Sequence, residues 1–246
     1  MNRTADKTDW DAGWAATCQK RIDMPQAWRG VETQYASATL QLVDSHAEHD
    51  VLESLLEASK PPLPKPRPRE QHFLLTTPFR YTPQHDSRFR PARPGCHGLW
   101  YGAEQLRGAC AEVAYWRMRF ILESAGLVEC RIVTRHTFFQ ALVEGQGIDL
   151  MAPPWLAFRH CWTDGSQYTH THRLSAAAEA AGAALIRYES VRAAGCACVA
   201  VFTPDALREP PGGLDATRQA WTCIATREQV LMHADADRAQ RFEWRE

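Results

Sequence analysis

The sequence lacks the long apolar segments of membrane proteins and the charge bias of nucleic-acid-binding proteins. No run approaches the roughly 18 consecutive apolar residues that a membrane helix needs. The first residues, MNRTADKTDWDAGW, lack the basic-then-apolar pattern of a signal peptide. Lys and Arg number 28 against 29 Asp and Glu, which leaves a net charge of −1. Such a balance gives no global attraction to nucleic acid or anionic lipid, so we expect a cytoplasmic protein that binds neither directly.

Several common catalytic signatures are also absent. The sequence contains no G-x-x-x-x-G-K-[ST] or G-x-G-x-x-G fingerprint, so P-loop and Rossmann nucleotide binding lack their usual signal. It contains no H-E-x-x-H and no G-x-S-x-G, and we interpret His170 and His172 as polar loop residues. Eight cysteines are present but none forms a C-x-x-C pair, so we expect buried free thiols and no metal site.

The chain does contain enough apolar material for a sizeable core, since 45% of its 246 residues are hydrophobic. Residues 45–60 predict a helix, because Ser45 and Glu48 make a capping box and Pro61 ends the pattern. Five of the eight residues at 61–68, PPLPKPRP, are proline, which predicts an extended connector; an SH3 or WW ligand is the alternative. We therefore divide the chain into a helical N-terminal extension at 1–68 and a main domain at 69–246.

The main domain mixes strands and helices without strict alternation. A long helix is predicted to begin after Gly102 and to end before Gly126, and an alanine-rich helix is predicted at 173–181. Strands are predicted at 99–101, 128–134, 184–188, 197–203, 221–226 and 229–233. This arrangement indicates an α+β fold.

Two features of the main domain carry candidate chemistry. From Lys60 to Arg93 there are eight basic residues and two acidic ones. A solvated basic face and a phosphate-binding site both fit this excess, since clustered guanidinium groups hold phosphate bidentately. Further on, Glu112 lies beside the apolar stripe of the long helix, where a carboxylate is costly without a purpose or a partner.

Five further segments follow one another along the chain: TTPFRYTP at 76–83, DSRFRP at 86–91, LWYGAE at 99–104, GACAEVAYWR at 108–117 and ALIRYESVR at 184–192. Together and in this order they resemble the RES domain, a family of bacterial toxins from toxin–antitoxin pairs. The resemblance covers about residues 70–235, and the preceding stretch is similar to the N-terminal extension of a longer branch of the family. It implies an ADP-ribosyltransferase-like fold, with a mixed sheet core and flanking helices.

The resemblance also implies site residues. The family's arginine falls on Arg80, its tyrosine on Tyr101, its glutamate on Glu112 and its serine on Ser190, and a further basic position matches Arg88 or Arg90. Many members carry a Gly and an Asn-Pro around this second arginine, whereas this chain reads SRFRPAR, which leaves the choice between the two open. Further candidates are Tyr81, which stacks or simply packs, and Arg192.

The chemistry implied by the resemblance is cleavage of the nicotinamide–ribose bond of NAD⁺, with no other cofactor and no metal. The arginines suit the pyrophosphate, the tyrosine suits nicotinamide, and the carboxylate suits a ribose that develops positive charge. The acceptor is phosphate, water or a protein side chain, and the extra arginines favour phosphate. The family further implies an antitoxin partner with an Xre-type helix-turn-helix domain. Two alternatives are protein ADP-ribosyl transfer and an inactive module that binds a nucleotide or a protein; a homodimer is open.

Overall fold

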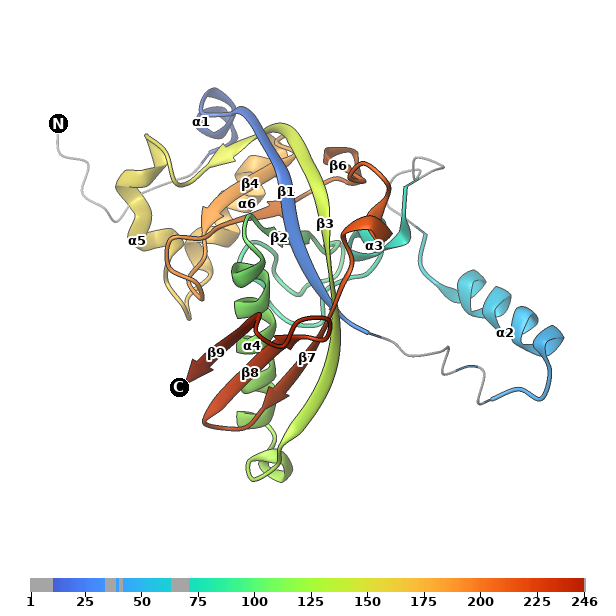
Figure 1. Cartoon of the computed structure of the whole chain (residues 1–246). Helices are drawn as coiled ribbons and strands as arrows, with labels where there is room; N and C mark the ends of the chain where they lie inside the picture. Colours follow the sequence, from blue (N-terminus) through green and yellow to red (C-terminus); the bar gives the residue numbers. More distant parts are fainter. Residues whose placement is uncertain (1–10, 34–38, 40–41, 63–70, 246) are drawn as a thin grey trace.

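A computed structural model describes residues 11–33, 39, 42–62 and 71–245 (Figure 1). The helices are α1 (Ala12–Thr17), α2 (His46–Ser59), α3 (Phe73–Thr76), α4 (Leu106–Leu122), α5 (Arg159–Trp162) and α6 (Thr169–Ala180). The strands are β1 (Lys20–Glu32), β2 (Trp100–Ala103), β3 (Ile132–Asp149), β4 (Leu185–Glu189), β5 (Ala197–Val201), β6 (Leu207–Arg208), β7 (Gln219–Ala225), β8 (Gln229–Ala234) and β9 (Arg241–Arg245). The expected α+β class, with a mixed sheet and flanking helices, is confirmed.

The strands form one nine-stranded sheet that is organised by the long ribbon of β1 and β3. The order is β1-β2-β5-β4-β3-β7-β8-β9, with β6 on β3, and only the β3–β4 pair is parallel among the described strands. β1 also pairs antiparallel with β3, from Lys20↔Gly147 to Glu32↔His136. Because β1 contacts β2 as well, at Trp28↔Ala103, five strands close into a ring while β7, β8 and β9 extend from β3.

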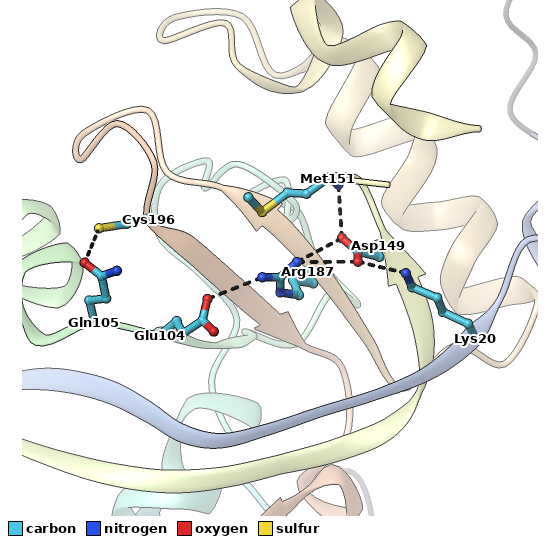
Figure 2. Close-up of polar contacts among 7 residues, drawn as sticks. All are labelled: Lys20, Glu104, Gln105, Asp149, Met151, Arg187 and Cys196. Atoms are coloured by element: carbon cyan, nitrogen blue, oxygen red, sulfur yellow. Dashed lines mark hydrogen bonds and ion pairs between the residues drawn. The ribbon is translucent and has the colours of Figure 1, made fainter. Parts of the chain in front are cut away.

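A chain of charged side chains ties one end of this ring together. Asp149, at the end of β3, forms ion pairs with Lys20 of β1 at 3.0 Å and with Arg187 of β4 at 3.4 Å. Arg187 also reaches Glu104, directly after β2, at 3.3 Å. Figure 2 shows Arg187 between the two carboxylates, so four elements are joined through shared charges.

The core lies on both faces of the sheet. Adjacent side chains of β3 point to opposite faces, so Phe138 joins one cluster and Phe139 the other. The larger cluster includes Trp221 and the buried side of α4, which packs against β1, β7 and β8 on the Phe138 face. This face also holds the site described below.

The N-terminal part differs from the expected helical extension. Lys20–Glu32 form β1, an interior part of the sheet, rather than a helix. The sequence does not indicate this strand, because a proline such as Pro25 has no N–H to donate and is unusual inside a sheet. In the structure Pro25 lies at a bulge between Met24 and Ala27. The predicted helix at 45–60 is confirmed as α2, with the Ser45 hydroxyl accepting from the Glu48 backbone at 3.2 Å.

The helix α2 projects away from the sheet (Figure 1), and none of its residues is buried. An ion pair of 2.8 Å between Glu57 and Arg80 links it to the main body. Most of the proline-rich connector, residues 63–68, lies outside the described residues. The helices and strands expected in the main domain are found, with ends shifted by a few residues, except that β3 continues from the expected 134 to Asp149.

Candidate functional site

A cavity of about 490 Å³ lies between α4 and the β1–β3 ribbon. Its walls come from α4, β1 and β2, from the ends of β4 and β5, and from the loops that carry Arg88, Tyr168 and Arg192. In Figure 1 α4 runs alongside the sheet next to β7 and β8. The cavity follows most of this helix, since its lining residues on α4 run from Ala109 to Phe120.

One stripe of α4 forms a whole wall of the cavity. Residues that are three or four apart share a helical face, and the lining set follows this spacing. The lining residues of α4 are Ala109, Glu112, Val113, Trp116, Arg117 and Phe120. Glu112 is the one acidic member of the stripe, and it lies toward the N-terminal half of the helix.

The Glu112 carboxyl is held in an environment that opposes its ionisation. Burial raises its pKa above the ordinary 4.5, and the opposing influences are the charges of Arg192 and Arg88 and a hydrogen bond with Ser190. Carboxyl groups with a perturbed pKa that lie beside cations in a cavity are frequent in functional sites, so Glu112 is a candidate functional residue.

Ser190 follows β4 and is 2% exposed. Its hydroxyl oxygen accepts hydrogen bonds from the backbone N–H groups of Arg192, at 3.2 Å, and Ala193, at 3.1 Å. Because the oxygen is the acceptor in both, its proton can be donated toward Glu112, where it opposes the rise in pKa caused by burial, or toward Cys198.

Arg88 enters the site from the turn closed by the Ser87↔Arg90 bridge. Its Nη1 donates to the carbonyls of Trp162 and Asp164, both at 2.8 Å, and the guanidinium lies 5.3 Å from the centre of the Tyr168 ring. These contacts hold the guanidinium through Nη1. The other N–H groups of Arg88 are suited to bind an anion.

Tyr101 of β2 supports the same turn. Its hydroxyl lies 2.9 Å from the Ser87 hydroxyl and accepts from the Phe89 backbone N–H at 3.3 Å. Burial raises the pKa of the phenol, so it stays neutral. The hydroxyl of Tyr101 is thus engaged by Ser87 and Phe89, which leaves the ring of Tyr101 to line the cavity.

Arg192 supplies a second guanidinium. It stacks on Tyr115, with its central carbon 3.4 Å from the ring centre, and donates to the Gly165 carbonyl at 3.1 Å. The structure therefore brings Arg88, Tyr101, Glu112 and Arg192 together in the lining of one cavity, whereas Ser190 is buried outside this lining and acts to lower the pKa of Glu112.

Three sequence-predicted residues lie elsewhere. Arg80 does not line the cavity and pairs with Glu57 of α2. Arg90 is held by Glu179 of α6 through two hydrogen bonds, at 2.8 and 3.1 Å, so Arg88 rather than Arg90 faces the cavity. Tyr81 is 40% exposed and outside the lining set. Their placement gives no support to a role for these three in binding the substrate.

Sequence reasoning missed the other half of the cavity. Trp28 and Glu32 come from β1, and Trp116, Arg117 and Phe120 come from α4. The α4 residues had a readable signal, because Trp116 and Phe120 follow Glu112 at steps of four. The β1 residues had none, since the strand itself was not predicted.

No group of three or more His, Cys, Asp or Glu side chains among the described residues is arranged to hold a metal ion. Within the same part of the chain, no helix combines the length and apolar character required to cross a membrane.

Comparison with known proteins gives a family match and a distant structural likeness. The model of the RES domain matches residues 65–224, which is more than half of the chain. No curated protein matches the chain. Among solved structures, the crystal structure of the Mycobacterium tuberculosis MbcT–MbcA toxin–antitoxin complex is similar, with a TM-score of 0.48 and 11% identity over 90% of this chain and 94% of that chain.

Proposed function

The chain belongs to the RES-domain family, and on this premise we propose that it is the toxin of a bacterial toxin–antitoxin pair that cleaves the nicotinamide–ribose bond of NAD⁺. The observation that carries the proposal is the Glu112 carboxyl, which lines the cavity together with Arg88 and Arg192. A carboxylate beside two guanidinium groups suits a substrate that is anionic at its pyrophosphate and becomes cationic at its ribose.

In the proposed reaction, the bond between the ribose C1′ and the nicotinamide nitrogen breaks, and its electron pair neutralises the pyridinium ring. The positive charge that develops on the ribose lies beside Glu112, which must be ionised to stabilise it. Arg88 and Arg192 hold the pyrophosphate, and Tyr101 provides an aromatic face for nicotinamide. Nicotinamide departs as a neutral molecule, and an oxygen of the acceptor forms the new bond to C1′; where the acceptor is water, its proton is released to solvent.

We propose inorganic phosphate as the acceptor ahead of water. Among the described basic residues between Lys60 and Arg93, Arg88 lines the cavity, whereas Arg90 pairs with Glu179. Arg192 adds a guanidinium that stacks on Tyr115 at the cavity wall. Two guanidinium groups at the reacting end suit both a pyrophosphate and a second phosphoryl group.

We also propose that an antitoxin with an Xre-type helix-turn-helix domain binds this chain and blocks the cavity. The structural relative, MbcT, is seen in complex with MbcA. Blockage of the cavity predicts that the complex has lower turnover than the free chain.

The test is incubation of purified, antitoxin-free protein with NAD⁺, with and without phosphate, followed by separation of nicotinamide, ADP-ribose and phosphorylated ADP-ribose. We expect nicotinamide release by the wild type and a loss of at least about 100-fold in Glu112→Gln. Phosphate-dependent release identifies a phosphorylase, and release without phosphate identifies a hydrolase. Nicotinamide without either product directs attention to a protein acceptor. Intact NAD⁺ after incubation with folded wild-type protein would refute the proposal.

A further inference from the structure

The outer half of the cavity takes no part in the proposed reaction. It begins one turn beyond Glu112 on α4, with Trp116, Arg117 and Phe120, and is completed by Glu32 and His136 from the β1–β3 ribbon. At 1.5 Å per residue, Phe120 lies about 12 Å along the helix from Glu112. A dinucleotide whose reacting ribose lies at Glu112 extends past it by a pyrophosphate and a second nucleoside.

Two aromatic rings line this outer half without being packed away. Trp116 and Phe120 are each 49% exposed, although both lie on the cavity wall one helical turn apart. Large exposed aromatic rings beside a cavity are typical of surfaces on which a base stacks, because the flat ring offers apolar area with few rotatable bonds. Val113 continues the apolar wall toward the reacting end.

A charged pair closes the outer end. Glu32 of β1 forms an ion pair with Arg117 of α4, and its side chain is 54% exposed. The carboxylate can therefore accept hydrogen bonds from a diol while its charge neutralises the neighbouring guanidinium. Carboxylates select ribose hydroxyls in this way in other dinucleotide sites, and a free arginine selects a 2′-phosphate.

We propose that the outer half of the cavity binds the adenosine part of NAD⁺, with Trp116 and Phe120 against the adenine and Glu32 on the ribose hydroxyls. This inference rests on the proposed function and extends it to substrate choice. Glu32 excludes a 2′-phosphate by repulsion and by keeping Arg117 engaged, so the chain discriminates against NADP⁺. Specificity thus comes from β1, which lies outside the residues matched by the RES family model.

The first experiment compares kcat/KM for NAD⁺, NADP⁺ and nicotinamide mononucleotide, which lacks the adenosine part. We expect the wild type to prefer NAD⁺ over both by at least about tenfold. Glu32→Gln should narrow the NAD⁺ to NADP⁺ preference by about tenfold, because Arg117 is released to bind the added phosphate. Trp116→Ala should lower kcat/KM for NAD⁺ by about tenfold and leave the mononucleotide reaction unchanged.

The matched control is Glu123→Gln. Glu123 forms a comparable surface pair with Arg119 on α4 but does not line the cavity, so its loss should change none of the ratios. Thermal unfolding of each variant establishes that it is folded. Equal cleavage of NAD⁺ and the mononucleotide by the wild type, or unchanged ratios in both variants, would overturn the subsite while the proposed function stands.

Binding measurements separate the two proposals if no turnover is seen. Calorimetric titration of the wild type with ADP-ribose and with its 2′-phosphate tests the subsite without chemistry. Tighter binding of ADP-ribose, weakened by Trp116→Ala, supports the subsite even where the proposed reaction fails. Absence of binding, or equal affinity for the two compounds, contradicts it.

Discussion

Arg88 and Arg80 show how the surroundings of a side chain decide its role. Both are arginines in segments that resemble RES-domain motifs, but Arg88 lines the cavity with its guanidinium plane fixed by two carbonyls. Arg80 forms an ion pair with Glu57 on a helix that projects from the body. A surface pair of this kind contributes little to stability and nothing to a distant site.

We therefore expect Arg88→Gln to lower kcat/KM for NAD⁺ by at least about 100-fold, whereas Arg80→Gln changes it less than about twofold. Arg88→Lys is the informative third variant, because it keeps the charge and loses the planar fork; partial activity is expected. Steady-state nicotinamide release measures all three, with circular dichroism to check folding. Loss in Arg80→Gln together with retention in Arg88→Gln would reverse the assignment.

Part of the site was predictable residue by residue. Glu112 stands out in the sequence because a carboxylate beside a buried stripe needs a partner, and Ser190 is that partner. The choice between Arg88 and Arg90 was not predictable, since it depends on Glu179, which lies 89 positions further along the chain. Arg192 gains its place through Tyr115 and Gly165, two contacts that no local pattern contains.

The strand β1 shows what element-level reasoning cannot obtain from a local pattern. Its partner β3 is more than 100 residues away in the sequence, so the hydrogen bonds that pair the two strands leave no signal in the residues near β1. β3 itself was predicted to end at Thr134, whereas the strand continues to Asp149 and includes Gly145 and Gly147. These glycines permit close packing: a Cβ at Gly147 would lie 2.5 Å from the Leu185 carbonyl oxygen. The strongly periodic α4 and α6 were predictable, since their pattern is local.

Gly30 allows a direct test of the β1–β3 ribbon. A Cβ there would lie 2.5 Å from the ring of Phe138, which is fully buried and has no room to move. We expect Gly30→Ala to destabilise the protein by about 1–3 kcal/mol, and to lower Tm by about 2–4 °C per kcal/mol in a chain of this size. Gly126→Ala is the control, because a Cβ at Gly126 meets nothing within 4 Å. Equal Tm values for Gly30→Ala and the wild type would show that the ribbon is looser than described.

At the scale of the whole molecule, the sequence indicated the α+β class but not the closed arrangement of strands. Composition and periodicity identify elements, whereas the ring exists only because β1 pairs with β2 as well as β3. The same closure places the cavity between α4 and a wall that includes residues 28–32. The strand β1 therefore belongs to the site.

A group that is buried for function affects the stability of the entire fold, and Glu112 provides the test. Because burial raises its pKa in the folded protein, the folded chain binds this proton more tightly than the unfolded chain does. Any stabilisation from protonated Glu112 is complete below the ordinary value of 4.5, and it is lost as pH rises through the raised, folded value. Above that value the folded protein carries the cost of an ionised, partly buried carboxylate.

Glu112→Gln removes this cost because the amide stays neutral. We expect the variant to have a higher Tm than the wild type at pH 8, by about 2–4 °C for each kcal/mol recovered, and the difference to shrink as pH falls toward 4.5. The reaction needs the ionised carboxylate, so kcat/KM of the wild type should rise with pH over the range in which its stability falls. Melting curves and rates on a common pH series measure both. A variant less stable than the wild type at pH 8 would show that Arg88 and Arg192 outweigh burial at this site, because the charged form would then be the favoured one.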